Sequence, residues 1–144
     1  VKAFSDNPES YLKLREDSSC KIKNARAQTG LKQAIQAFLE ENFNKIEGHD
    51  GPLFLFGSGG HSIKLTKVMS NLGMRSIDGV VDKLETPDSR YFQGIKIVSP
   101  KDLADTKNPL VILSSKSYEP LFASIMQKEA PNIPFLRIWG DNDD

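Results

Sequence analysis

The chain has 144 residues, 38% of them hydrophobic and 26% charged, and its 19 basic and 19 acidic side chains leave no formal net charge. This length and composition are typical of one ordinary globular domain, which buries roughly two thirds of the surface of its unfolded chain. The charge balance excludes attraction to nucleic acids or membrane surfaces through net charge, so neither is expected as a partner.

Cys20 is the only cysteine of the chain, which excludes an internal disulfide and a cysteine-based zinc site. A single thiol fits the reducing cytoplasm, the compartment that we expect. No apolar run approaches the ~18 residues of a membrane-spanning helix, and no signal peptide is visible. Because the chain starts at Val1 without a methionine, we expect a fragment of a longer protein.

Residues 1–28 are predominantly polar and predict a lead-in to the domain, with a short helix over residues 10–15. Lys21, Lys23 and Arg26 form a loose basic patch within it. An arm that binds nucleic acid would interleave aromatic residues with such a patch and would carry net positive charge. Neither is present, so we expect a solvated segment that packs a few side chains on the domain.

The apolar residues of segment 29–50 recur at three- and four-residue spacing, which predicts an amphipathic helix over residues 29–46. Thr29 is a suitable N-cap, and Gly48 lies just past the last periodic position. We expect this helix to pack on the rest of the domain. Its apolar positions are Leu31, Ile35, Phe38, Leu39, Phe43 and Ile46.

Residues 51–144 alternate short apolar runs with helical patterns, an order typical of an α/β domain with a parallel sheet and right-handed crossovers. The predicted strands cover residues 53–56, 77–81, 95–98, 110–113 and 135–139. Helices are predicted over residues 61–72, from Ser99 onward and over 119–129, and a polar loop over 83–92. This pattern predicts a sheet of five strands in the order 3-2-1-4-5.

The first predicted strand runs directly into a glycine-rich turn and a helix. Gly57 and Gly59 match the first two glycines of the dinucleotide-binding fingerprint, and Ser62 stands at the third position. Asp82, at the end of the second predicted strand, is placed to accept hydrogen bonds from ribose hydroxyls. Because such a turn presents free backbone N–H groups and a helix N-terminus to an anion, we expect a nucleotide-like ligand with its phosphate here.

His61 begins the helix beside this turn. Three roles are open to it: neutralising a phosphate, acting as a general base beside a bound sugar, or being a polar residue of the first helical turn. Ser114 and Ser115 follow the fourth predicted strand, where crevice loops lie, and their hydroxyls suit a phosphate or a sugar. The alternative for this loop is structural, with Ser117 capping the next helix.

Residues 55–61, 79–82 and 92–103 resemble three stretches of a recurring Rossmann-like module. That module stands in front of left-handed β-helix sugar acyltransferases and precedes the catalytic domain of FkbM-type methyltransferases. The resemblance covers about residues 52–139 and implies a three-layer fold that binds part of a nucleotide-sugar. Neither hexapeptide repeats nor a methyltransferase domain follows in this chain, so it implies a non-catalytic accessory part of a transferase, beside an adjoining catalytic domain.

The residue pattern and the resemblance together predict a Rossmann-like, three-layer α/β domain that binds a nucleotide or nucleotide-sugar in sugar or polysaccharide modification. A nucleotide-sugar, NAD or S-adenosylmethionine would each suit the predicted pocket. No metal site is predicted, because the two histidines lack nearby carboxylates. The expected cofactor-binding residues are Gly57, Ser58, Gly59, Gly60, His61, Asp82, Ser114 and Ser115.

Two other interpretations stay open. One is a domain of a methyltransferase or an NAD-dependent enzyme, although the Tyr-x-x-x-Lys pair of short-chain reductases is absent. The other is an interaction scaffold, in which Phe38, Leu39 and Phe43 form an exposed patch at a homo-oligomer or interdomain face. Tyr118 and Trp139 are expected to pack within the domain rather than to stack on a ligand.

Overall fold

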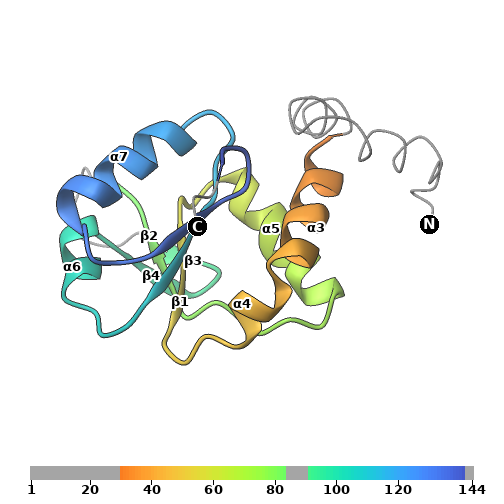
Figure 1. Cartoon of the computed structure of the whole chain (residues 1–144), viewed down its shortest axis with the longest axis horizontal. Helices are drawn as coiled ribbons and strands as arrows, with labels where there is room; N and C mark the ends of the chain where they lie inside the picture. Colours follow the sequence, from red (N-terminus) through yellow and green to blue (C-terminus); the bar gives the residue numbers. More distant parts are fainter. Residues whose placement is uncertain (1–29, 84–90, 142–144) are drawn as a thin grey trace.

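The computed structural model describes residues 30–83 and 91–141, and the predictions for residues 1–28 and for the Thr29 cap lie outside them. Within the described residues the chain forms one sheet with helices on both of its faces (Figure 1). The protein is therefore a mixed α/β domain, as the alternation of apolar runs and helical patterns predicted.

The sheet has six strands in the order β3-β4-β2-β1-β5-β6, and every pairing except that of β3 with β4 is parallel. The parallel strands are β1 (Leu53–Phe56), β2 (Gly79–Val81), β4 (Ile95–Val98), β5 (Leu110–Leu113) and β6 (Phe135–Arg137). Each of them falls on one of the predicted strands, and they neighbour one another in the order 3-2-1-4-5.

A sixth strand corrects the predicted order of the whole sheet. β3 (Tyr91–Phe92) pairs antiparallel with β4, where a polar loop was expected. Gln93 and Gly94, with φ of 51° and 83°, connect the two strands. Two consecutive positive φ values match the twist of a two-residue hairpin. The sheet order therefore differs from the prediction because β3 is added at one edge.

Two of the parallel strands, β2 and β6, are shorter than predicted. Before β2, the carboxylate of Asp78 rather than a backbone carbonyl accepts the N–H of Leu53, at 2.9 Å. After β6, the carboxylate of Glu119 accepts three successive backbone N–H groups. In both places a side chain takes over bonds that a sheet ladder would otherwise make.

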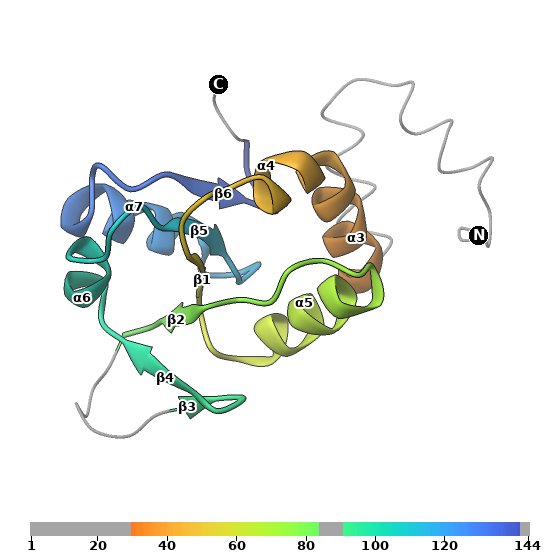
Figure 2. The same cartoon turned by 90° about the horizontal axis from the view of Figure 1, so that it is seen from below.

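Helices cover both faces of the sheet (Figure 1, Figure 2). One face carries α3 (Leu31–Glu41), α4 (Phe43–Glu47) and α5 (Gly60–Asn71), and the other carries α6 (Pro100–Ala104) and α7 (Glu119–Glu129). The predicted start of α6 is confirmed: Ser99 and Asp102 form a reciprocal capping box, with proline at the first helical position. The predicted range of α7 is confirmed as well.

β1 and β5 form the buried centre of the sheet, since every residue of both strands is buried. They pair in parallel register, from Leu53 with Leu110 to Phe56 with Leu113. Continuous apolar runs of this kind are typical of parallel strands that helices cover on both faces. One hydrophobic cluster joins these strands to α3 and α5, and a second joins them to α6 and α7.

The N-terminal helix is interrupted, so the single helix predicted over residues 29–46 is wrong. Asn42 separates α3 from α4, and both its side-chain amide and its backbone N–H donate to the carbonyl of Phe38. Phe38 and Leu39 are buried in the cluster that includes α5. The predicted exposed patch is therefore absent from this surface, and of its three residues only Phe43 is exposed.

α5 begins at Gly60, one residue before its predicted start at His61, and ends at Asn71, just before the predicted stop at Gly73. Gly73 has φ of 71° and donates its N–H to the carbonyl of Ser70 at 3.0 Å. The N–H of Met74 donates to the carbonyl of Met69 at 3.0 Å, which completes a Schellman motif. This motif closes the helix and buries Met74 in the core.

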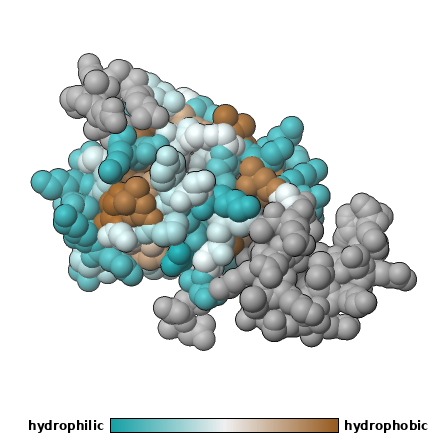
Figure 3. Space-filling model, turned by 90° about the horizontal axis from the view of Figure 1, so that it is seen from above, coloured by the Kyte–Doolittle hydropathy of each residue, from teal (hydrophilic) through white to brown (hydrophobic). Residues whose placement is uncertain are grey.

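Nothing among the helices of residues 30–83 and 91–141 combines the length and the apolar character that a membrane span requires. The face in Figure 3 is largely hydrophilic, and its hydrophobic surface is divided into separate patches. The large hydrophobic side chains exposed in the described part of the chain are Phe43, Ile63, Tyr91, Tyr118 and Leu121.

Candidate functional site

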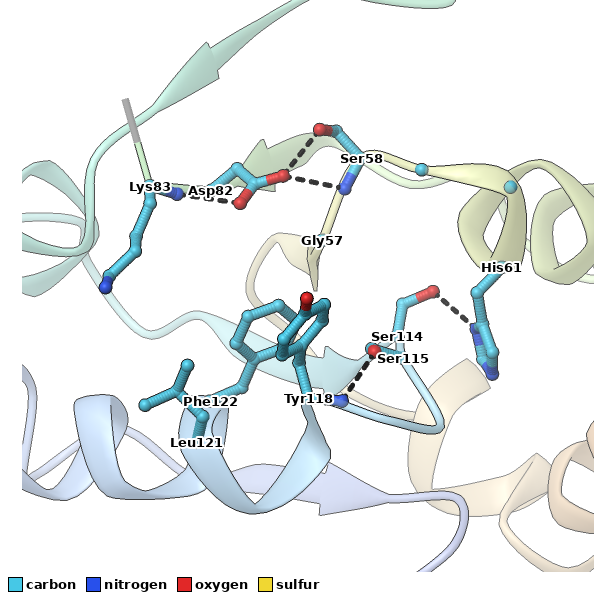
Figure 4. Close-up of a pocket in the computed structure, with 12 residues that line it drawn as sticks. Gly57, Ser58, His61, Asp82, Lys83, Ser114, Ser115, Tyr118, Leu121 and Phe122 are labelled. Atoms are coloured by element: carbon cyan, nitrogen blue, oxygen red, sulfur yellow. Dashed lines mark hydrogen bonds between the residues drawn. The ribbon is translucent and has the colours of Figure 1, made fainter. Parts of the chain in front are cut away.

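The connections of β1 and β5 place a crevice at the carboxyl end of the sheet. From β1 the chain passes through α5 to β2 on one side, and from β5 it passes through α7 to β6 on the other. Ligands of open α/β sheets bind where neighbouring strands diverge in this way. A pocket of about 540 Å³ lies here (Figure 4), and it is lined by Gly57, Ser58, Gly59, Gly60, His61, Asp82, Lys83, Ser114, Ser115, Tyr118, Leu121 and Phe122.

All eight residues predicted to bind a cofactor line this one pocket. They come from three separate stretches: the glycine turn after β1, the end of β2 and the loop after β5. Parallel strands bring these stretches together because their carboxyl ends meet at the same edge of the sheet. The sequence therefore identified the polar wall of the pocket, whereas Lys83, Tyr118, Leu121 and Phe122 were missed.

The three glycines of the turn serve different purposes. Gly57 has φ of 121°, and a Cβ built on it would lie 2.7 Å from the carbonyl oxygen of Ser114, so the fold itself requires glycine there. A Cβ on Gly59 or Gly60 would meet no atom within 4 Å, and neither residue has a positive φ. The packing of the described chain gives no reason for glycine at these two positions. Their effect is to keep the pocket open beside the start of α5.

The same turn presents unused backbone donors. The N–H of Gly57 donates to the carbonyl of Val81 at 2.8 Å, and that of Ser58 donates to Asp82. For Gly59, Gly60 and His61, no acceptor of the backbone N–H lies within the described residues. The first N–H groups of a helix point out of its N-terminal end. Three neighbouring donors beside a pocket suit an anionic group such as a phosphate.

Asp82 braces the glycine turn. Its Oδ2 accepts from the backbone N–H of Ser58 at 3.0 Å and from the hydroxyl of Ser58 at 2.5 Å, and its Oδ1 accepts from the N–H of Lys83 at 2.7 Å (Figure 4). A carboxylate has about four lone-pair positions. Three are used by donors within the described residues, which leaves one to accept from a ligand hydroxyl.

A directional chain of hydrogen bonds joins His61 to the glycine turn. The indole N–H of Trp139 can only donate, so Nε2 of His61, 3.0 Å away, accepts. The proton of the neutral ring therefore sits on Nδ1 and donates to the hydroxyl of Ser114 at 2.9 Å. At the far end, the carbonyl of Gly57 can only accept, so it receives the hydroxyl hydrogen of Ser62 at 2.6 Å. A hydroxyl has one hydrogen, and the 2.7 Å bond between the two serines is therefore donated by Ser114.

The hydrogen-bond chain and the burial of the ring together determine the tautomer and the charge of His61. Burial lowers the pKa of its imidazole from 6.5 to about 4, so the ring is neutral at physiological pH. Both ring nitrogens are engaged by protein groups. Of the three roles open to His61, the geometry favours the structural one, because the ring has no charge for a phosphate and no unengaged nitrogen for a base.

The serines near the site have separate tasks. Ser62 and Ser114 are buried and belong to the hydrogen-bond chain. Ser62 stands at the third position of the glycine fingerprint. It links α5 to the turn through its hydrogen bond to the carbonyl of Gly57, and it is also small enough for close packing of helix and strand. Ser115 accepts the N–H of Tyr118 at 2.9 Å ahead of α7. The N-cap of α7 is Tyr118, and no side chain caps the helix, so the predicted cap by Ser117 is wrong.

Glu119 anchors the segment that carries Trp139. Its buried carboxylate accepts the backbone N–H groups of Ile138, Trp139 and Gly140 at 2.9, 2.8 and 2.6 Å, and it pairs with Arg137 at 3.1 Å. In the sequence Glu119 resembles any acidic residue in the first turn of a helix, a position that the helix dipole favours. No local signal indicates its partners in the C-terminal segment.

The wall of the pocket on the α7 side is apolar. Phe122 stacks on Phe56 with ring centroids 4.3 Å apart, and the ring of Tyr118 lies 6.2 Å from that of Phe122. Tyr118 is 61% exposed, which corrects the expectation that it packs within the domain. Tyr118 lies at the start of a helix that begins at the carboxyl edge of the sheet, and this position is the sequence signal for a residue that lines the pocket.

Metal-binding clusters of three or more histidine, cysteine or acidic side chains are absent from the residues that the structure describes. Comparison of the chain with protein-family models, with curated proteins and with solved structures finds no match. The function of the pocket therefore has to be argued from its geometry.

Proposed function

We propose that this chain is a Rossmann-like module that binds a nucleotide or nucleotide-sugar at the carboxyl edge of its sheet, and that it serves as the non-catalytic part of a sugar-modifying transferase. The phosphate of the ligand would lie against the start of α5. The strand order around β1, the glycine turn and the acidic residue after β2 support this proposal together.

One observation carries the proposal: Gly59 and Gly60 lack side chains at positions where the packing of the described residues leaves room for one. Glycine is common at the N-cap, which is Gly59, whereas at Gly60, the first residue of α5, alanine would favour the helix more than glycine does. Close approach of a ligand to the backbone is a reason to keep it. The unused N–H groups at the same positions supply the donors that a phosphate requires.

A non-catalytic role is supported by how the pocket's reactive side chains are used. Both ring nitrogens of His61 and the hydroxyl of Ser114 are engaged by other groups of the site. A general base or nucleophile needs a lone pair or proton within reach of the substrate. The arrangement suits holding a ligand, and the reaction would belong to an adjoining catalytic domain.

Ligand titration tests the proposal. Thermal unfolding of the purified chain would be followed with UDP-glucose, NAD, S-adenosylmethionine and inorganic pyrophosphate, each added separately. A ligand that binds only the native state at 100 times its Kd adds about 2.7 kcal/mol to the free energy of unfolding, so the midpoint should rise by several degrees. No shift with any of the four compounds would contradict the proposal.

Glycine substitutions locate the binding. Gly60→Ala should weaken binding at least about tenfold, because its methyl group enters the open space of the pocket. The variant should unfold at the same temperature or slightly higher, since alanine favours the helix. Ser70→Ala, an exposed substitution on the same helix, is the matched control and should leave binding unchanged.

A further inference from the structure

The pocket has two chemically different walls. Around Gly59, Gly60 and Asp82 it offers polar groups, and on the α7 side it offers the side chains of Tyr118, Leu121 and Phe122, which we call the aromatic wall. Figure 4 shows the aromatic wall on the opposite side of Gly57 from Asp82. A phosphate or a sugar would satisfy the polar groups alone, and it would leave the aromatic wall in water.

Resting on the function proposed above, we propose that the aromatic wall receives the planar base of a nucleotide and makes Tyr118 the residue that selects base-bearing phosphates over sugar phosphates. The base would lie on the α7 side of the glycine turn. Aromatic side chains bind nucleic-acid bases through stacking that tolerates different bases, because every base has a π-face.

Exposure supports this role. Tyr118 and Leu121 are 61% and 43% exposed, so two of the five exposed large hydrophobic side chains of the described residues line this single pocket. Isolated exposed apolar residues are ordinary on protein surfaces, whereas apolar residues grouped in a concave site are typical of ligand pockets. The exposure of both side chains leaves them available to a ligand.

The aromatic wall is also held in place. The N–H of Tyr118 donates to the hydroxyl of Ser115, and Phe122 is buried against Phe56 and Gly57. A ring that already lies over a fixed neighbour loses little conformational freedom when a ligand stacks on it. Tyr118 is therefore preorganised to stack on a planar base. Its truncation to alanine should weaken ligand binding rather than lower the stability of the fold.

The test compares three phosphates that differ only beyond the ribose: AMP, UMP and ribose 5-phosphate. Isothermal titration of the full chain should show AMP and UMP binding at least about tenfold more tightly than ribose 5-phosphate, a difference of about 1.4 kcal/mol. Tyr118→Ala should reduce this ratio to near one, with little change for ribose 5-phosphate. Tyr118→Phe keeps the ring and should keep the ratio.

Two further variants separate the two proposals. Tyr91→Ala removes an equally exposed tyrosine from β3, outside the pocket, and should change nothing. Gly60→Ala should weaken all three compounds alike and leave their ratio unchanged. Equal binding of the three compounds, or a ratio that survives Tyr118→Ala, would overturn the role of the aromatic wall and leave the phosphate site standing. If none of the three binds, the role of the aromatic wall fails, and the proposed function fails with it when UDP-glucose, NAD, S-adenosylmethionine and pyrophosphate also leave the unfolding midpoint unchanged.

Discussion

The indole nitrogen of Trp139 lies 3.0 Å from Nε2 of His61, although the two residues are 78 positions apart in the chain. An indole N–H cannot accept a hydrogen bond, so this contact assigns the histidine tautomer. Through Ser114 and Ser62 the assignment reaches the carbonyl of Gly57. The C-terminal segment that carries Trp139 is thereby connected to the glycine turn by an unbroken series of hydrogen bonds.

Replacing the indole should release the imidazole. In Trp139→Phe, Nε2 of His61 loses its donor, so the proton is no longer confined to Nδ1. Nitrogen-15 NMR of the imidazole should show a single tautomer in the unaltered protein and a mixture in the variant. Lys116→Ala, which removes the ammonium group 4.9 Å from the centre of the Trp139 ring, should leave the tautomer unchanged. A mixture already present in the unaltered protein would contradict the assignment.

Stability should fall as the pH drops from 7 to 5. Burial lowers the pKa of His61 to about 4 in the folded state, against 6.5 in the unfolded chain. Between these values the unfolded state binds the extra proton, so the free energy of unfolding rises with pH and is lost as pH falls. After allowance for the partial exposure of the ring, the loss by pH 5 should be about 1 kcal/mol.

Urea denaturation at several pH values measures this loss. The slope should become smaller in His61→Gln, which cannot titrate in this range. His49→Gln removes the other histidine and should retain the slope. An identical slope in the unaltered protein and in His61→Gln would show that His61 is not the group responsible.

Ser62 should be essential to the stability of the turn. In Ser62→Ala the buried carbonyl of Gly57 loses its donor, and the hydroxyl hydrogen of Ser114 loses its acceptor while the Ser114 oxygen still accepts from His61. A buried polar group without a partner costs about 1–3 kcal/mol, so unfolding in urea should require that much less free energy. Ser70→Ala, at an exposed position of the same helix, should change it by less than about 0.5 kcal/mol. Equal effects of Ser62→Ala and Ser70→Ala would mean that the buried hydrogen bonds of Ser62 contribute nothing to stability.

Glu119 should hold the C-terminal segment in place. Glu119→Gln replaces an acceptor of backbone N–H groups by an amide that has one acceptor oxygen, and it removes the buried negative charge that pairs with Arg137. We expect a loss of about 2–4 kcal/mol. Trp139 is the only tryptophan of the chain, so its fluorescence should report a change of environment. Glu129→Gln, at the other end of α7, is the control and should leave both readouts unchanged.

Local patterns were sufficient for the central strands. β1 and β5 are continuous apolar runs bounded by turn residues, and such runs are covered on both faces wherever they occur. The predicted loop over 83–92 failed at its end, because the pairing of β3 depends on a partner strand as well as on its own two residues. The predicted single N-terminal helix failed at Asn42, whose side chain caps the carbonyl of Phe38.

The sequence by itself determined that the glycine turn, Asp82 and the serines after β5 meet at one edge, because parallel strands align their carboxyl ends whatever the details of packing. Only the tertiary structure decided that His61 is a neutral link rather than a base, that Glu119 holds the segment around Trp139, and that Tyr118 faces the pocket. These contacts join residues far apart in the chain, and they depend on how helices settle against the sheet. The spacing of residues along the sequence does not predict that geometry.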